Sequence, residues 1–180
     1  MTKLIQTYLA DTTNKEIQQA LWRILQAIDS DFVPSLSSRK STAAMQLNPK
    51  ANGSTDHLKD YFKELIQQMV VIAKVEDCIA GFLTFKHQYH IDLLPEYAPC
   101  NYITTIGVSP EYRNQGVGLS LYKFILTRLP AHLISPFWVT RTWSQNYSHL
   151  RLLNSLGFNL VKIIEHHRGP DLHTLYYAYN

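Results

Sequence analysis

Hydrophobic residues recur with the period of a helix in two early stretches of the chain. In 17–28 and in 58–66 they lie three and four residues apart, which predicts two amphipathic helices. The apolar positions are Ile17, Ala20, Leu21, Ile24, Leu25 and Ile28 in the first stretch, and Leu58, Tyr61, Phe62, Leu65 and Ile66 in the second. The sequence TNKE at 13–16 precedes the first helix. It predicts a capping box, in which the Thr13 hydroxyl and the Glu16 carboxylate each accept a hydrogen bond from an unpaired amide.

Runs rich in β-branched and aromatic residues predict strands around these helices. MVVIAKV at 69–75 and CIAGFLTFKH at 78–87 are separated only by Glu76 and Asp77, so we expect an antiparallel hairpin. Further strands are predicted at 3–9, 101–108, 137–143, 158–165 and 172–179. The last two are joined by HHRGPD and are expected to form a closing hairpin.

Two more helices follow the strands at 101–108 and 137–143. The third begins near Gly116, and its expected buried residues are Val117, Leu121, Phe124, Ile125 and Leu129. The fourth, at 146–156, is expected to end at Gly157, because glycine favours the left-handed backbone that follows many helices. The resulting order, β-α-α-β-β-β-α-β-α-β-β, predicts a single mixed α/β domain over residues 1–180 with a βαβ crossover.

Composition and charge narrow the class of protein. With 46% hydrophobic and 17% charged residues the chain is typical of a globular domain. Its apolar runs are far shorter than the roughly 18 residues of a membrane span, and the N-terminus turns polar too early for a signal peptide. Cys78 and Cys100 form no metal or redox motif, so we expect a reducing, cytoplasmic setting. The net charge of +3 is scattered, which suits an anionic ligand and argues against nucleic acid.

The segment VSPEYRNQGVG at 108–118 carries the clearest chemical signal. A strand that ends at Val108 and a helix that begins near Gly116 would point unpaired helix amides outward, where they bind phosphate well. Gly116 and Gly118 lack the Cβ atoms that would keep an anion from the backbone, and Arg113 adds a positive charge. The loop therefore fits a diphosphate, although an ordinary strand-to-helix turn is the alternative.

The common phosphate-loop patterns do not match this segment. A P-loop requires a Lys followed by Ser or Thr, and no such pair follows Gly118. The dinucleotide fingerprint requires a third glycine at position 121, which is Leu121 here.

The pattern V-x-P-x-x-R-x-x-G-V-G instead resembles the acetyl-CoA-binding motif of the GNAT superfamily of acyl-CoA-dependent N-acyltransferases. A second segment, NYSHLRLLNSLGF at 146–158, resembles that family's later N-x-x-A-x-x-L-Y-x-x-x-G-F motif, and it matches at Asn146, Leu152, Gly157 and Phe158. The spacing of the two motifs and the order of elements also agree, so the resemblance covers essentially the whole chain.

The resemblance implies a three-layer fold, with a twisted mixed sheet of about six or seven strands flanked by about four helices. Two splayed parallel strands, 101–108 and 137–142, would hold acetyl-CoA as co-substrate. The implied cofactor-binding residues are Ile106, Gly107 and Val108 along the pantetheine, Arg113, Asn114, Gln115, Gly116, Val117, Gly118 and Leu119 at the diphosphate, and Asn146 at the pantetheine arm.

The implied reaction is transfer of an acetyl group to a primary amine by direct attack, and here the match to the family breaks. The tyrosine that commonly protonates the leaving thiolate is replaced by Leu153. His149 lies four residues earlier, on the same helix face, and an imidazole can supply a proton. Ser144, Tyr147 and Ser148 are weaker candidates, and the thiolate can also take its proton from water. A non-catalytic acyl-CoA sensor or interaction module is the alternative function.

Several residues are candidates for the general base. They are Glu96 in the 88–100 loop, Tyr102 and Thr104 on the central strand, and His87 and His90. We take His149, Glu96 and Tyr102 as the predicted catalytic residues. His87 and His90 would point to opposite faces of a strand, so we expect no metal site.

The acceptor is the least determined part of the prediction. Asp92 and Glu96 would attract a cationic amine, while Tyr89 and Tyr97, together with the Tyr176–Tyr177 pair, would wall a small pocket. The sequence does not distinguish a small amine, a peptide N-terminus, a lysine side chain and an aminoglycoside as the acceptor.

The long polar segment 31–54 is either a lid over this site or a mobile connector. Any homodimer is expected to form through the closing strands.

Overall fold

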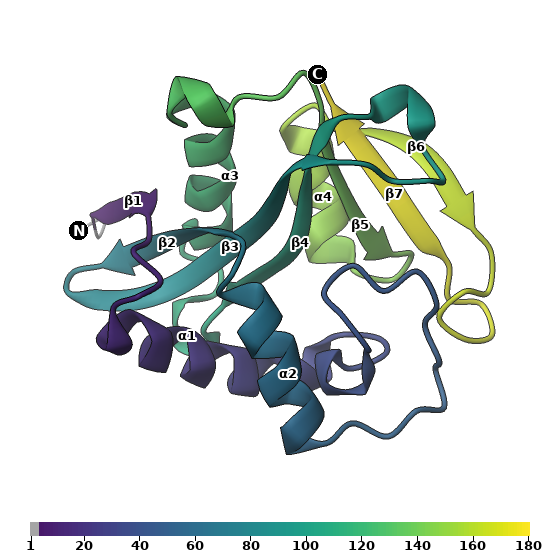
Figure 1. The fold of residues 1–180 in the computed structure, drawn as a ribbon, viewed down its shortest axis with the longest axis horizontal. Coiled ribbons are helices and arrows are strands. Elements are labelled where there is room, and N and C mark those ends of the chain that lie inside the picture. Colours follow the sequence, from purple (N-terminus) through teal and green to yellow (C-terminus); the bar gives the residue numbers. More distant parts are fainter. Residues whose placement is uncertain (1–3) are drawn as a thin grey trace.

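The computed structural model describes residues 4–180, which form a seven-stranded mixed sheet and four α-helices (Figure 1). The strands are β1 (Ile5–Leu9), β2 (Met69–Val75), β3 (Cys78–Tyr89), β4 (Cys100–Val108), β5 (Trp138–Trp143), β6 (Asn159–Ile164) and β7 (Thr174–Tyr179). The helices are α1 (Lys15–Ile28), α2 (Thr55–Leu65), α3 (Val117–Thr127) and α4 (Tyr147–Ser155). This is the predicted order of elements. Residue 3 of the strand predicted at 3–9 lies outside the described residues.

The sheet has the order β1-β2-β3-β4-β5-β7-β6, and helices cover both of its faces. All neighbouring strands are antiparallel except β4 and β5, which are parallel. In Figure 1, α1 and α2 lie on the lower side of the sheet, and α3 and α4 lie on the other side. Alternate residues of β2 point to opposite faces of the sheet. Val70 and Ile72 pack with α1 and α2, whereas Val71 and Ala73 pack with α3. The predicted three-layer fold is confirmed.

The start of α1 differs from the prediction by one residue. Asn14, not Thr13, caps the helix, because its Oδ1 accepts hydrogen bonds from the amides of Glu16 (2.8 Å) and Ile17 (3.2 Å). The Thr13 hydroxyl donates instead to the Asp11 carboxylate, at 2.7 Å. Asp11 therefore captures the side chain that the capping box would have used.

The segment 31–54 packs against the sheet and α2, although its composition is polar. It contains a 3₁₀ turn at Leu36–Ser38, and both Leu36 and Thr42 are buried. In Figure 1 it runs beneath the end of β5 towards the hairpin of β6 and β7. Segments far apart in the sequence therefore meet at this end of the sheet.

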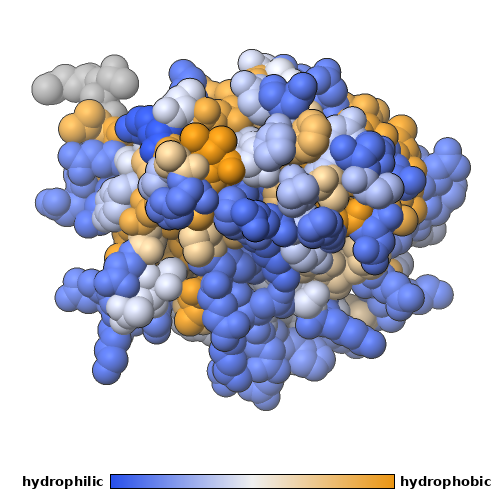
Figure 2. Space-filling model, turned by 45° about the horizontal axis from the view of Figure 1, so that its top comes forward, coloured by the Kyte–Doolittle hydropathy of each residue, from blue (hydrophilic) through white to orange (hydrophobic). Residues whose placement is uncertain are grey.

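The surface shows no membrane-spanning element among the described residues. No helix within residues 4–180 is both long enough and apolar enough to cross a bilayer. In Figure 2, hydrophobic residues appear as separate groups among hydrophilic ones on the face that is drawn. Cys78 and Cys100 are both free thiols.

Candidate active site

A bulge in β4 opens the sheet at the site. In the pairing of β3 with β4, Thr84 lies opposite Thr105 and Phe85 lies opposite Ile103, so Thr104 is an extra residue. The parallel pairing of β4 with β5 runs from Asn101 to Ile103 and does not continue past the bulge. The rest of β4 therefore diverges from β5 and leaves backbone groups available between the two strands.

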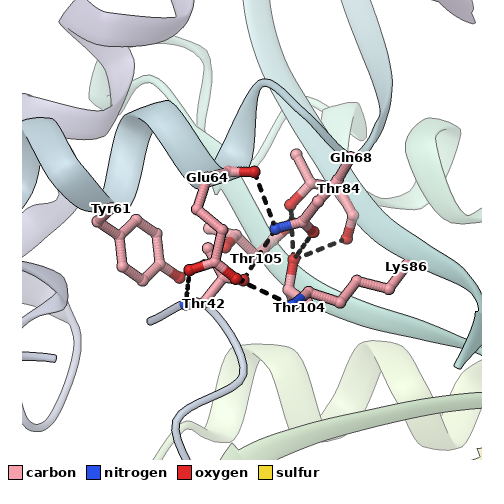
Figure 3. Close-up of polar contacts among 8 residues, drawn as sticks. All are labelled: Thr42, Tyr61, Glu64, Gln68, Thr84, Lys86, Thr104 and Thr105. Atoms are coloured by element: carbon pink, nitrogen blue, oxygen red, sulfur yellow. Dashed lines mark hydrogen bonds and ion pairs between the residues drawn. The ribbon is translucent and has the colours of Figure 1, made fainter. Parts of the chain in front are cut away.

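A polar network holds the bulge in place (Figure 3). The Thr104 hydroxyl donates to Gln68 Oε1 at 2.6 Å and lies 2.9 Å from the hydroxyl of Thr84. Gln68 Nε2 donates in turn to the Thr42 hydroxyl at 2.8 Å, which ties the 31–54 segment to the same point. Three elements that are distant in sequence thus fix the conformation of one strand.

Glu64 of α2 is the acidic group of this network. Its carboxylate accepts from the Thr42 amide (3.0 Å), from the Thr42 hydroxyl (2.6 Å) and from Lys86 Nζ (2.9 Å). Burial tends to raise the pKa of Glu64, but the hydrogen bonds from Thr42 and Lys86 outweigh it and leave the pKa below its ordinary value. Glu64 is therefore ionised and fully engaged, which suits a structural role.

We expect Thr104→Val to destabilise the protein by about 1–2 kcal/mol, because the isosteric change removes two hydrogen bonds from the bulge. Urea unfolding followed by circular dichroism measures this loss. Thr104→Ser, which keeps the hydroxyl, is the control and should lose much less. Equal stability of Thr104→Val and the wild type would show that the network does not hold the bulge.

A cleft of about 490 Å³ opens where β4 and β5 diverge. Its walls come from β4, the loop that follows it, the first turn of α3, β5, α4 and the end of α1. The lining residues are Ile28, Asp31, Phe32, Ile103, Thr104, Thr105, Ile106, Gly107, Val108, Tyr112, Arg113, Asn114, Gly116, Val117, Gly118, Leu119, Thr140, Arg141, Thr142, Trp143, Asn146, Ser148, His149 and Leu152. This set includes every predicted cofactor-binding residue except Gln115, which is exposed and donates to the Glu111 carbonyl at 2.9 Å.

The glycine loop has the geometry of an anion-binding helix start. Asn114 and Gly116 have positive φ values of 59° and 83°, which turn the chain sharply into α3. Gly116 is the N-cap residue and has no side chain to satisfy the first amides of the helix. At Gly118, an added Cβ would meet only Leu152 Cδ2 at 3.5 Å, an ordinary contact. The fold therefore does not demand glycine at 118, and the missing side chain leaves the first turn of α3 open on the side of the cleft.

Arg113 forms an ion pair across the mouth of the cleft. Its Nη2 lies 2.5 Å from Asp31 Oδ2, and its Nε donates to the Val108 carbonyl at 3.4 Å. Both side chains of the pair are close to half exposed. An anion that binds at the helix start must compete with Asp31 for this arginine.

Asp31→Asn is expected to tighten coenzyme A binding by up to about 5-fold, since an exposed ion pair is worth roughly 0–1 kcal/mol. Calorimetric titration of both proteins with coenzyme A measures the change. Glu111→Gln removes the same charge from an exposed side chain that does not line the cleft, so it should leave the affinity nearly unchanged. Weaker binding by Asp31→Asn would contradict the competition.

His149 lies on the cleft wall and contacts a buried tyrosine. Its Nε2 is 2.7 Å from the hydroxyl of Tyr122 on α3, and Thr140 also interacts with that hydroxyl. Tyr122 and Leu153 are fully buried in the core beneath α3 and α4. The position that is commonly tyrosine in the family is thus occupied by Leu153, which lies in the core. A different tyrosine, Tyr122, contacts the cleft-lining His149.

Burial changes the protonation of both partners. It lowers the pKa of His149 to about 4 and raises the pKa of Tyr122 above its usual range. At neutral pH the imidazole is therefore uncharged and the phenol keeps its proton. The pKa of His149 lies well below the ordinary imidazole value of 6.5 because the helix packing desolvates the ring.

The other two predicted catalytic residues lie outside the cleft lining. Glu96 is exposed in a 3₁₀ turn at Pro95–Tyr97. Tyr102 is buried and stacks on Tyr89 with ring centroids 5.4 Å apart, and burial raises its pKa. The structure does not bring either residue to His149, and their catalytic roles stay predictions.

Two further sequence candidates, His87 and Asn146, have structural partners. His87 Nδ1 lies 2.7 Å from Asn101 Oδ1, in contact with the strand next to β3. Asn146 donates to the Thr142 hydroxyl at 3.1 Å and stands at the start of α4. Within residues 4–180, no group of three or more His, Cys, Asp or Glu side chains is arranged to hold a metal ion.

Several cleft residues were not predicted from the sequence. Phe32 and Trp143 both line the cleft and contact each other, with ring centroids 5.8 Å apart, and Arg141 lies two residues before Trp143 on β5. Two of these residues could have been found from the sequence, because the alternation of side chains along FWVTRTW puts Arg141 and Trp143 on one face of the strand.

Comparison with known proteins agrees with this geometry. Residues 26–158 match the acetyltransferase (GNAT) family. The chain belongs to the GNAT acetyltransferase family. The uncharacterized protein YrkN of Bacillus subtilis strain 168 is 37% identical over 68 residues, which is 37% of this chain and 35% of YrkN, so the match spans only about a third of that relative.

Solved structures share the fold over nearly the whole chain. A GNAT-family acetyltransferase from Bacillus cereus ATCC 10987 is 20% identical with a TM-score of 0.64, and the match covers 98% of this chain and 97% of that one. The yncA structure from Salmonella typhimurium, described with its cofactor acetyl-CoA, is 16% identical with a TM-score of 0.57, covering 98% and 93%. At these identities the likeness shows the fold.

Proposed function

We propose that this protein transfers an acetyl group from acetyl-CoA to a primary amine by direct attack of the amine on the thioester. The observation that carries the proposal is the cleft between the diverging strands β4 and β5, which ends at the uncapped first turn of α3. Membership of the GNAT acetyltransferase family supports it, as does the acetyl-CoA in the Salmonella structure.

The chain offers a distinct group to each part of acetyl-CoA. The backbone groups of Ile106 and Val108 that face away from β3 would pair with the pantetheine amides like an added strand, and Gly107 would lie between them along the pantetheine. The first-turn amides of α3, with Arg113, would bind the diphosphate. Asn146, whose side chain lines the cleft, would contact the pantetheine arm.

The reaction forms a C–N bond and breaks the C–S bond, so charge develops on the carbonyl oxygen and then on sulfur. A backbone amide near Val108 would stabilise the first charge. The negative charge on sulfur would be stabilised by the hydrogen-bonded pair of Tyr122 and His149. If the protonated Tyr122 hydroxyl donates to His149 Nε2, the imidazole keeps its proton on Nδ1 and can donate it in a hydrogen bond to the thiolate.

Proton release from the amine is assigned to water. Among the described cleft-lining residues, Asp31 is the single carboxylate, and it is paired with Arg113. The amine therefore has to enter uncharged or to lose its proton to solvent. On this account the coenzyme A thiolate also takes its final proton from water, and the imidazole stabilises it without ionising.

The alternative function is a non-catalytic acyl-CoA-binding module, which the burial of Leu153 at the usual tyrosine position favours. Release of the coenzyme A thiol from acetyl-CoA, measured with and without a panel of amines, separates the two. Amine-dependent release supports the enzyme. Tight acetyl-CoA binding with no release by any amine would support the module. The cytoplasmic location and a homodimer stay predictions from the sequence.

A further inference from the structure

Three arginines gather on the face of the sheet that carries the 31–54 segment. They are Arg39 in that segment, Arg141 on β5 and Arg168 in the connection of β6 to β7, and we call them the arginine cluster. Arg39 and Arg168 are buried, with exposed fractions of 8% and 2%. The pKa of Arg39 is lowered to about 10 and that of Arg168 to about 8, mainly by burial, and the charge of Arg141 contributes to both shifts. The three positive charges therefore repel one another in a poorly solvated place.

Two members of the cluster use their donors to hold the fold together. Arg39 donates from Nε (3.2 Å) and Nη2 (2.9 Å) to the Pro34 carbonyl. Arg168 donates from Nη1 to the Val33 carbonyl at 2.6 Å and from Nε to the Thr174 hydroxyl at 2.9 Å. These acceptors are neutral oxygens, so they satisfy the donors and leave the charges uncompensated.

Arg141 is the member whose two terminal nitrogens have no hydrogen-bond partner among the described residues. Both of these atoms, Nη1 and Nη2, are buried. Burial tends to lower the pKa of Arg141, but the neighbouring hydroxyls of Tyr102 and Tyr176 outweigh it and leave the pKa above its ordinary value. Arg141 is therefore charged, and a neutral phenol does not cancel a guanidinium charge. A buried charge without a partner costs several kcal/mol, which a bound anion would recover.

No carboxylate of the described chain forms an ion pair with the cluster. The acidic group whose charge reaches Arg39 is Asp29, and its two oxygens accept from the amide and the hydroxyl of Ser37, both at 2.7 Å. Asp92 and Glu96, expected from the sequence to attract a cationic amine, are exposed and do not line the cleft. The charge at this wall is therefore positive, the reverse of the sequence expectation.

The position of Arg141 separates it from the diphosphate site. Val139, two residues earlier on β5, packs with Tyr102 and Ala43 on the face covered by the 31–54 segment. The first turn of α3 lies on the opposite face. Arg141 nevertheless lines the same cleft, so a molecule held by it would reach the diverging strands from the other side of the sheet.

We propose that the acceptor is an amine that also carries an anionic group, a carboxylate or a phosphate, and that Arg141 binds this group. This inference rests on the proposed function and names the substrate class of the same site. Arg39 and Arg168 are positioning residues that add to the positive field: Arg39 fixes the conformation within the 31–54 segment, and Arg168 ties that segment to the hairpin. The fork of donors on a guanidinium matches the two oxygens of either anion.

The first test compares acceptors that are matched in structure apart from the anion, with each rate expressed per concentration of uncharged amine. Amino acids are set against their own carboxamides, and O-phosphoethanolamine against ethanolamine, with thiol release from acetyl-CoA as the readout. We expect kcat/KM for one of the acidic series to exceed that of its neutral partners by about 100-fold, and Arg141→Met to remove most of that difference. Neutral amines that react equally well would overturn the inference while the proposed function stands. If acetyl-CoA binds but no amine reacts, the proposed function fails, and the second test decides on the anion site alone.

The second test measures thermal unfolding with coenzyme A at saturation, which occupies the diphosphate site. Arg141→Met should unfold at a temperature equal to or above that of the wild type, because it removes an uncompensated buried charge. The matched control, Arg168→Met, should unfold at a lower temperature, because it removes the donor of the Val33 carbonyl and one of the two partners of the Thr174 hydroxyl. Added sodium phosphate, against sodium chloride at equal ionic strength, should raise the unfolding temperature of the wild type by about 2–4 °C and leave that of Arg141→Met unchanged. Destabilisation of Arg141→Met as large as that of Arg168→Met, or an equal phosphate effect in both proteins, would overturn the anion site.

Discussion

Gly118→Glu is expected to weaken coenzyme A binding by at least about 100-fold while the fold stays intact. The new Cβ meets only Leu152 at 3.5 Å, and a carboxylate in the first turn of a helix is favourable for the helix itself. The same carboxylate would occupy the place of the diphosphate and repel it. Calorimetric titration with coenzyme A gives the affinity, and circular dichroism confirms the fold.

A matched variant separates charge from bulk at this position. Gly118→Gln adds a side chain of similar size without the charge, so it should weaken binding less than Gly118→Glu. Gly118→Ala should have the smallest effect, since only the Cβ is added. Unchanged affinity in Gly118→Glu would discard the assignment of the loop.

His149→Ala is expected to lower kcat at saturating acetyl-CoA by about 10- to 100-fold, at the lower end of what positioned acid–base groups contribute. Coenzyme A affinity should change much less, because the ring acts mainly after the C–S bond begins to break. Tyr122→Phe removes only the hydroxyl that orients the imidazole and should lower kcat by a smaller factor. Single-turnover kinetics with each variant measure these effects. Equal turnover in His149→Ala would make the residue structural.

The pH dependence of stability gives an independent check on His149. Its pKa in the folded protein, about 4, is below its ordinary value of 6.5, so between these values the unfolded chain binds more protons than the folded one. The stability that the neutral ring contributes is therefore complete above pH 6.5 and is lost as the pH falls towards 4. His149→Gln should lose less stability than the wild type over this window in urea unfolding measured at several pH values. A wild-type and a variant curve of the same shape would show that the ring is not desolvated.

The sequence predicted the parts of this molecule that depend on local periodicity. The order of elements follows from residues such as Ile17, Leu21 and Ile24, whose spacing reports a buried helix face whatever that face packs against. The cleft-lining glycine loop was equally visible, because a strand, a turn and a helix start are adjacent in sequence. The helix cap was predicted at Thr13 but is Asn14, because the Thr13 hydroxyl donates to a competing local acceptor, Asp11.

The parts that were missed depend on contacts between distant segments. The bulge at Thr104 is held by Gln68 and Thr84, and no local pattern in NYITTIGV signals an extra residue. The contact of Tyr122 with His149 joins α3 to α4, and no local pattern predicts a contact between two separate helices. The sequence showed only that Leu153 replaces the family's usual tyrosine. The arginine cluster draws on three segments, and each arginine by itself is an ordinary charged residue in the sequence.

The central claim is that the cleft between β4 and β5 binds acetyl-CoA. Isothermal titration of the purified protein with acetyl-CoA, with ATP and NAD as controls, tests it most directly. We predict one saturable site with micromolar affinity for acetyl-CoA and much weaker binding of ATP and NAD, because the two controls lack the pantetheine that we propose to pair with Ile106 and Val108. A folded protein that binds neither acetyl-CoA nor a longer acyl-CoA, or that binds ATP equally well, would contradict the account.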